Sequence, residues 1–299
     1  MFRLIIILLG VILIPLNSLG QDYAWWNETH NWDGYTPWYD YITTNTAHMG
    51  PNALPVPIVN QGRTLRNAEL KIGTDLHFSP GDNTQNSNTS FYLPLHTPKV
   101  GLQVQIVPFE FYQTDTATRN LRAARGESGK GFAVGDFYVG TYVQVIENHR
   151  FWPDIMLSIN LKTASGSKLS DARFTDSPAY FMDLSFGKNY SLNNSQTTTI
   201  RPFAMGGFYV WQMHGNAQQQ DDAFLYGLGV KLTHKKLIFQ STLAGYYGYL
   251  NNGDRPLVFR AKLKTNLDRQ LNYSFSFQKG LHDFPFNTFS INLVANFHK

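Results

Sequence analysis

The stretch from Leu257 to Phe297 alternates apolar and polar side chains with a period of two. A period of two places successive side chains on opposite faces of a β-sheet. Here one face is apolar and aromatic, whereas the other carries amides, hydroxyls and cations. Segments of about ten residues with this pattern, joined by tight turns, are typical of strands that face lipid on one side and water on the other. The pattern therefore predicts an all-β fold, a transmembrane antiparallel β-barrel.

The N-terminus has the features of an export signal. Arg3 precedes an apolar run from Leu4 to Leu16, and Ser18-Leu19-Gly20 supplies small residues for cleavage. The run is shorter than the ~20 residues that a membrane-spanning helix needs, although an uncleaved anchor is the alternative. We expect residues 1–20 to be a cleaved signal peptide, residues 21–41 an aromatic-rich N-terminal segment and residues 42–299 the barrel.

The composition narrows the functional classes. The chain has no cysteine, so neither a disulfide framework nor a lipoprotein anchor is available. The net charge of +4 is small, and the cations alternate with apolar residues instead of clustering on a helix, so we expect no nucleic-acid partner. Aromatic residues make up 15% of the chain, which suits the girdles of a barrel at the two membrane interfaces.

Eleven segments with the alternating pattern can be counted, and their connections alternate in length. Short connections such as residues 147–152 alternate with longer polar ones such as residues 164–178. Outer-membrane barrels have short periplasmic turns and longer extracellular loops, so the last strand should run toward the periplasm and the strand count should be even. We expect about twelve strands, with the missing one between Ile42 and Asn60 and with residues 79–98 as a long connection. Ten strands with an N-terminal plug are the second choice.

Three stretches resemble a known family of outer-membrane barrels. Ala133-Val134-Gly135-Asp136-Phe137-Tyr138-Val139 is similar to that family's Gly-Asp strand opening. Residues 153–166 are similar to its strand ending in Leu-Lys-x-Pro-x-Gly, with Ala164 where proline is usual, and residues 49–57 resemble a segment of Bacteroidetes-type relatives. The family is the one named after the MetA pathway of phenol degradation. The resemblance implies a barrel of about twelve strands associated with transport of small compounds, including aromatic ones.

Charged side chains on the polar faces of the predicted strands form the main chemical feature. A cation on the lipid face costs about 2–4 kcal/mol at mid-bilayer, so such cations should face the lumen, where a one-sided ladder would favour anionic solutes. The alternative is that they pair with luminal carboxylates, Asp154 and Asp183 included, and fill the barrel with ion pairs. The predicted luminal residues are Arg260, Lys262, Lys264, Lys231, Lys162, Glu69, Asp75 and Asp136.

Two other segments are candidates for contact with a solute. The loop of residues 164–178 should fold over the barrel mouth with Lys168, Asp171, Arg173 and Asp176, although a solvated loop held by Asp–Arg pairs is an equal alternative. The N-terminal segment could stack on sugars or aromatic solutes or act as a plug, but such clusters more often anchor at the membrane interface. Its tryptophans are Trp25, Trp26, Trp32 and Trp38.

Signals for catalysis or metal binding are weak. His77 and Ser79 lie close together in sequence, but no strained turn or known motif surrounds them, so a luminal histidine beside a loop serine is the favoured interpretation. Oxygen-bearing residues alternate from Asp82 to Asn88, but the central glycine and terminal glutamate of a calcium loop are missing. We therefore predict no catalytic residue, no metal and no cofactor.

These observations together predict a channel or transporter for small solutes with a restricted, partly cationic lumen. It should lie among the lipids of the outer membrane of a Gram-negative bacterium, with a monomer as the favoured state. A lipid-modifying hydrolase with a Ser–His pair, and a non-conducting structural or secretion-associated barrel, are the alternatives.

Overall fold

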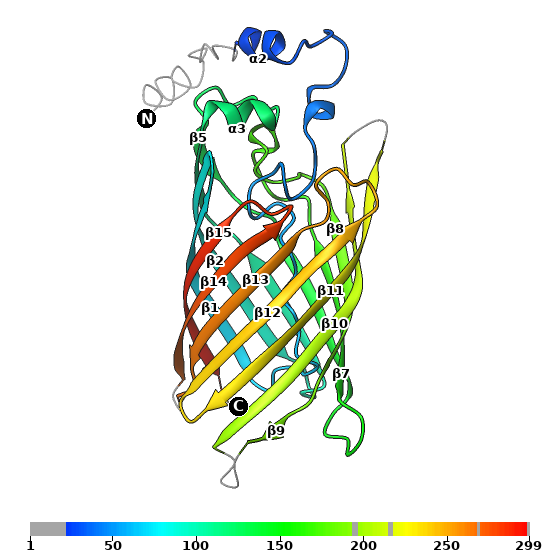
Figure 1. The fold of residues 1–299 in the computed structure, drawn as a ribbon, viewed down its shortest axis with the longest axis vertical. Helices are drawn as coiled ribbons and strands as arrows, with labels where there is room; N and C mark the ends of the chain where they lie inside the picture. Colours follow the sequence, from blue (N-terminus) through cyan, green and yellow to red (C-terminus); the bar gives the residue numbers. More distant parts are fainter. Residues whose placement is uncertain (1–21, 193–196, 215–217, 268–269, 298–299) are drawn as a thin grey trace, which may run out of the picture. The chain divides into compact units, whose positions relative to one another are not determined.

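The computed structural model describes residues 22–192, 197–214, 218–267 and 270–297. One antiparallel sheet closes on itself into a barrel, since its first and last strands pair (Figure 1). The sheet contains fifteen strands, and twelve of them form the closed wall. Around the wall the order is β1 (Ala68–Ser79), β2 (Asp82–Pro94), β3 (Val100–Ile106), β6 (Tyr138–Ile146), β7 (Asp154–Lys162), β8 (Ala179–Gly187), β10 (Thr198–Gln212), β11 (Gln220–His234), β12 (Leu237–Gly248), β13 (Leu257–Thr265), β14 (Leu271–His282) and β15 (Asn287–Phe297), which pairs with β1. The predicted barrel of twelve strands is confirmed.

Three short strands extend the wall. β4 (Glu110–Thr114) pairs with the first half of β2, β5 (Lys130–Ala133) pairs with β4, and β9 (Tyr190–Ser191) pairs with β10. The remaining elements are short helices, named α2 (Ala24–Thr29), η1 (Trp38–Tyr41), α3 (Thr116–Leu121) and η2 (Leu169–Asp171). Among the described residues, no helix is long and apolar enough to cross a membrane.

The chain divides at Tyr35 into two units. Within the first unit, α2 carries two of the predicted aromatic residues, and the ring of Trp26 lies 5.0 Å from the ring of His30. The barrel and residues 36–67 belong to the second unit. The predicted signal peptide, residues 1–20, lies outside the described residues.

The outer wall is covered by apolar side chains, as the period of two predicts. Ile291 and Leu228 are each 60% exposed, and Phe275 is 53% exposed. Such exposure of large apolar side chains on nearly every strand far exceeds the patches of a soluble protein, so this surface faces lipid. The inward positions next to them, such as Ser290 and Asn292, are polar and partly or fully buried.

The connections define two different ends of the barrel. We call the end with the longer connections, such as residues 163–178 and 249–256, the loop end, and the opposite end, with short turns such as residues 235–236, the turn end. β1 starts at the turn end and β15 finishes there. The predicted direction of the last strand relative to the short turns is therefore correct.

The position predicted for the twelfth strand is wrong, because that strand is β2. β1 and β2 are joined by a tight turn at Pro80-Gly81, where Gly81 has a φ of +77°, so residues 79–98 are not one long connection. The first half of β2 is polar on both faces, since the outward Asn83 and Gln85 are as polar as their inward neighbours. In the sheet these two residues lie opposite Phe78 and Phe111, which supply the apolar side chains on this part of the wall.

Residues 42–66, which we call the luminal segment, form no strand and run through the barrel from one end to the other. Near the loop end, Asn45 Nδ2 donates to the backbone carbonyl of Asn252 at 2.7 Å. At the turn end, Thr64 Oγ1 donates to the backbone carbonyl of Pro98 at 2.6 Å. The first barrel strand thus begins at the turn end after the preceding residues have crossed the interior.

Prolines explain why this segment does not pair as a strand. Pro55 and Pro57 have no N–H to donate, so an extended backbone here cannot take a place inside a sheet. Wall side chains bind its carbonyl oxygens instead, and they donate from Tyr246 Oη to Leu54 at 3.1 Å and from Arg260 Nη2 to Val56 at 2.6 Å. Apolar residues of the segment also pack against the wall in the main core cluster, Leu54, Val56 and Val59 with Phe203, Met205, Tyr209, Trp211, Leu225, Tyr246 and Phe286 among others.

A charge placed on the outer wall should destabilise the barrel, whereas the same charge on the inner wall should not. We expect Ile291→Arg to lower the free energy of unfolding by about 2–4 kcal/mol, the cost of a cation at mid-bilayer. Ser290→Arg, one position away but facing the lumen, is the matched control and should change stability by less than about 1 kcal/mol. Urea titrations of folding in lipid vesicles, followed by tryptophan fluorescence, measure both. Equal effects of the two substitutions would contradict the assigned faces.

Candidate functional site

The loop between β7 and β8 folds into the barrel mouth and carries an arginine with no exposed surface. The Arg173 guanidinium donates to Glu110 at 2.8 Å, to Asp82 at 2.7 Å and to Thr84 at 2.7 Å. β2 and β4 supply these partners because they pair at the loop end. A buried guanidinium is costly unless its N–H groups are hydrogen-bonded and its charge is paired, and these partners meet both conditions. Burial alone lowers the pKa of Arg173, but the two carboxylates outweigh that effect and raise it.

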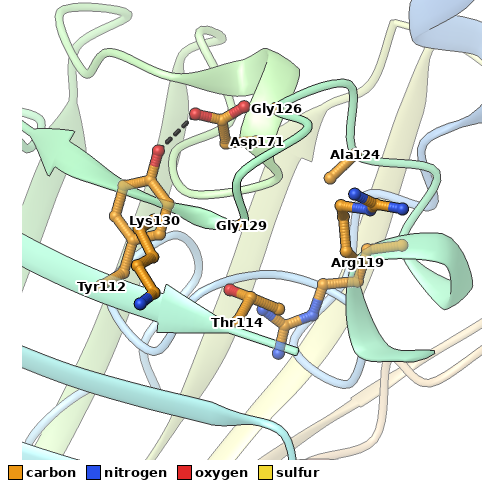
Figure 2. A pocket seen from close by; sticks show the side chains of 9 residues that line it. Tyr112, Thr114, Arg119, Ala124, Gly126, Gly129, Lys130 and Asp171 are labelled. Carbon is orange, nitrogen blue, oxygen red and sulfur yellow. Dashed lines mark hydrogen bonds between the residues drawn. The ribbon is translucent and has the colours of Figure 1, made fainter. Parts of the chain in front are cut away.

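Further contacts close the mouth around this arginine. Arg122 Nη1 donates to Asp82 Oδ2 at 2.5 Å, and the Arg173 guanidinium lies 4.7 Å from the centre of the Tyr112 ring. Figure 2 shows the Tyr112 hydroxyl donating to the Asp171 carboxylate beside a small pocket. The pocket has a volume of about 10 Å³, the space of roughly one water molecule. This pocket therefore has no room for a solute in this conformation.

The predicted mouth-loop residues divide into two pairs. Asp171 and Arg173 belong to the contacts that close the mouth, so their side chains do not point toward a free passage. Lys168 and Asp176 are exposed, and Lys168 Nζ lies 3.9 Å from Asp171 Oδ2. The Asp–Arg contacts that sequence analysis named as an alternative do occur, but they are buried between the loop and the wall.

Lys162 and Asp136 form a buried pair that positions the same loop. Their side chains lie 2.8 Å apart with no exposed surface, and Lys162 Nζ also donates to Thr175 Oγ1 and to the carbonyl of Ser177. Asp136 Oδ1 accepts from the backbone N–H groups of residues 165 and 166. Both residues were predicted to face the lumen, and the structure assigns them to holding the base of the loop.

A second charged network holds the luminal segment near the turn end. Asp154 Oδ2 accepts from Arg63 Nε at 2.6 Å and from Arg201 Nη2 at 2.8 Å. Arg201 also donates to the backbone carbonyl of Gln61 at 2.7 Å. Arg201 thus binds both the Asp154 carboxylate of β7 and the backbone of the segment, which holds the segment against the wall at this depth.

Between the two networks, Asn60 joins the segment to the wall. Its Nδ2 lies 3.2 Å from Ser158 Oγ and 3.2 Å from both carboxylate oxygens of Asp183. The Ser158 hydroxyl also donates to Asp183. The contacts are neutral or singly charged hydrogen bonds, each contributing about 0.5–3 kcal/mol, so they hold the segment without fixing it permanently.

The remaining predicted luminal cations differ in their partners. Lys264 Nζ lies 3.2 Å from Glu69 Oε2, and Arg260 binds the backbone of the luminal segment. Lys231 and Lys262 have no ion pair or hydrogen bond with any described residue, and both are only half-buried. Asp75, also predicted here, accepts from Asn86 and Asn88 on β2. The lumen therefore contains both paired charges and cations without an anion.

Trp38 is the one predicted tryptophan in the barrel unit. It packs against a mouth cluster that includes Ile42 and Met49, and the Arg125 guanidinium lies 5.3 Å from the centre of its ring. A role of Trp25, Trp26 and Trp32 in binding a solute stays a prediction.

The structure does not bring His77 and Ser79 together as a catalytic pair. His77 Nδ1 lies 2.8 Å from Thr288 Oγ1, and His77 Nε2 lies 2.7 Å from Asn86 Oδ1. The Ser79 hydroxyl donates to the neighbouring carbonyl of Pro80. Within the described ranges, no group of three or more metal-ligating His, Asp or Glu side chains occurs.

The wall residues that contact the luminal segment were not predicted from the sequence. Arg201, Gln144 and Tyr246 occupy inward positions of their strands, so the period of two does place them in the lumen. Their partners are backbone groups of residues 54–62, far away in sequence, and no local pattern identifies such partners.

Comparison with known proteins gives a likeness of fold. No protein-family model matches the chain, and no curated protein sequence matches it. An outer-membrane channel from Pseudomonas putida F1 aligns with a TM-score of 0.50 and 11% identity, over 82% of this chain and 97% of that one. The KdgM porin in complex with disordered oligogalacturonate gives 0.48 and 11%, over 76% and 99%, and the transport unit of the autotransporter AIDA-I from Escherichia coli gives 0.49 and 7%, over 86% and 100%.

The fold is that of outer-membrane β-barrels. At 11% identity, the likeness to the Pseudomonas putida channel is one of architecture alone.

Removing the central arginine of the mouth should destabilise the barrel. We expect Arg173→Ala to lower the free energy of unfolding by about 3–5 kcal/mol, because Glu110 is then buried without a cation. Arg150→Ala, an exposed arginine in a short turn, is the matched control. Arg173→Lys keeps the charge but loses the planar guanidinium that binds several partners at once, so its loss of stability should lie between those of the two alanine variants. Thermal unfolding followed by circular dichroism measures all three. An effect of Arg173→Ala no larger than that of Arg150→Ala would refute the role of these contacts.

Proposed function

We propose that this chain is an outer-membrane channel or transporter for small solutes, closed in the present conformation by its luminal segment and its mouth loop. The proposal rests on one observation, that residues 42–66 occupy the lumen. The luminal segment occupies the interior and is held there by hydrogen bonds to wall side chains, by the Arg63–Asp154 ion pair and by apolar packing. A barrel with a purely structural role needs no such segment, since inward side chains can pack a narrow lumen by themselves.

The difference between the two ends of the lumen supports a closed channel. At the loop end Arg173 and Asp82 have no exposed surface, and an apolar cluster fills the space around residues 54–59. Toward the turn end Lys231 and Lys262 are only half-buried and have no anionic partner among the described residues. An ammonium group without an anionic partner keeps its charge at low cost only where water can solvate it. Closure is therefore tightest at the loop end and in the middle of the lumen.

The proposal keeps several predictions from the sequence. Cleavage after residue 20, a monomeric state and a Gram-negative outer membrane with the loop end facing outward fit a channel of this kind. Membership of the family named after the MetA pathway of phenol degradation remains a proposal, supported by the similar residues 153–166, which form β7 and the start of the mouth loop. The hydrolase alternative has no support from the contacts of His77, whose two ring nitrogens already have partners.

A reversible lock on the luminal segment tests the proposal. The chain has no cysteine, so Asn60→Cys with Ser158→Cys would place a single pair of thiols between the segment and β7, at residues whose Nδ2 and Oγ atoms now lie 3.2 Å apart. Titration of free thiols after oxidation shows whether the disulfide has formed. In planar bilayers we expect the reduced protein to open and the oxidised protein to stay closed, because conduction requires the segment to move.

The single variants Asn60→Cys and Ser158→Cys are the matched controls and should conduct equally with or without reductant. Equal conductance of the oxidised and reduced double variant would show that the segment does not gate the lumen. Absence of conductance from the wild type and from the reduced variant, with the barrel folded by circular dichroism, would overturn the channel itself.

A further inference from the structure

The wall formed by β13, β14, β15 and β1 carries a group of lysines that the luminal segment does not neutralise. Lys262 and Lys264 face inward from β13, and Lys71 faces inward from β1. Lys71 and Lys264 lie close enough to Lys262 to repel it, and Lys264 also repels Lys231 on β11. We call these four lysines the basic cluster.

The carboxylates near the basic cluster do not balance it. Glu69 pairs with Lys264 at 3.2 Å, and Asp75 already accepts two hydrogen bonds from Asn86 and Asn88. Four lysines against these two carboxylates leave a formal excess of two positive charges. Within the described part of the chain, Lys71, Lys231 and Lys262 have no ion pair at all. Cations held close together and away from bulk water repel one another unless an anion joins them.

The wall between the lysines offers hydrogen-bonding groups that have no partner. Ser274 lies opposite Lys264 in the sheet on one side and opposite Asn292 on the other, and all three face the lumen. Ser274 is fully buried, and neither its hydroxyl nor Asn292 Oδ1 has a hydrogen-bond partner in the described residues. A buried hydroxyl normally has a partner, so this one is available to a bound molecule.

Among the described residues, the luminal segment makes no polar contact with the basic cluster. The segment's polar contacts toward the turn end are made with β6, β7, β8, β10 and β12, through side chains such as Gln144, Asp183, Arg201 and Gln240. Its contact with β13 is made at Arg260, nearer the loop end than Lys262. The four lysines of the basic cluster keep part of their surface exposed, and the segment supplies no anion to them.

We propose that the basic cluster binds small oxyanions of charge −2, such as a dicarboxylate or hydrogen phosphate. The excess of positive charge in the basic cluster favours a ligand with more than one negative charge. The ammonium groups and the Ser274 hydroxyl supply donors, and charge-assisted hydrogen bonds to carboxylate or phosphate oxygens are stronger than neutral ones. This inference deepens the proposed function by naming the class of solute, and it rests on that function only for the passage of the ligand, not for its binding.

Calorimetric titration of the purified full chain in detergent micelles tests the site directly. The probes are succinate and inorganic phosphate as dianions, acetate as a monoanion and choline as a cation, at low ionic strength. We expect both dianions to bind, acetate to bind more weakly and choline not to bind. The affinity should fall as salt is added, since the Debye length shortens from about 30 Å at 0.01 M to about 10 Å at 0.1 M.

Substitutions of matched charge separate the site from a general effect of positive charge. Lys262→Gln should weaken dianion binding about tenfold, the effect of losing one charge-assisted hydrogen bond. Lys236→Gln, in an exposed turn, removes the same charge and should leave the affinity unchanged. Lys262→Arg should retain binding, which shows that the barrel variant is folded and that charge is the property required.

The outcomes distinguish this inference from the channel proposal. Dianion binding without conductance would keep the site and overturn the channel, whereas conductance without dianion binding would keep the channel and overturn the site. Equal affinity for acetate and succinate, or equal affinity of Lys262→Gln and Lys236→Gln, would also refute the inference. Tighter binding of phosphate than of succinate, or the reverse, would identify which of the two oxyanion types the site prefers.

Discussion

The interior of this barrel depends on hydrogen bonds between wall side chains and the backbone of the luminal segment. Because the segment lies inside the barrel and belongs to no sheet, its carbonyl and N–H groups need partners from the wall. Buried backbone groups without partners cost free energy comparable to a lost hydrogen bond. Here Tyr246, Arg260, Arg201 and Gln144, from four different strands, donate to the carbonyls of residues 54–62. The inward side chains thus replace the neighbouring strand that the luminal segment lacks.

These contacts divide the interior into regions of different character. Where apolar residues of the segment meet the aromatic residues of β10 and β12, the interior resembles the core of a soluble protein. Where loop residues meet β2 and β4, it is a dry ionic network built around Arg173. Where the segment makes no polar contact with the basic cluster, lysines remain without partners among the described residues and need water. Local charge balance follows from the path of one segment through the lumen.

The sequence predicts the wall well and the interior poorly, for a physical reason. A strand between lipid and water must alternate, so eleven strands are visible in the sequence. Arg260, Lys262 and Lys264 alternate on β13 with the more exposed Phe259 and Leu263. The alternating pattern does not identify β2, because Asn83 and Gln85 on its outer face are polar. Phe78 and Phe111 of the neighbouring strands supply the apolar cover there. The path of the luminal segment is not predicted, because its prolines weaken any strand pattern and its hydrogen-bond partners are distant in sequence. The pairing of Lys162 with Asp136 was not predicted either, because the two-residue alternation within a strand does not show which residues of different strands meet.

The seam between β1 and β15 has a consequence for assembly. The first and last strands of the barrel pair over their whole length, from Ala68 with Phe297 to Phe78 with Asn287, so the wall can become continuous only after the C-terminal strand is in place. The luminal segment is covalently attached to the first residue of that seam and occupies the inside. Either the wall wraps around the segment before the seam forms, or the N-terminal part of the chain is threaded through a finished ring. Wrapping avoids the entropic cost of threading, which favours a folding order in which the segment binds its arginines first and the seam then captures it.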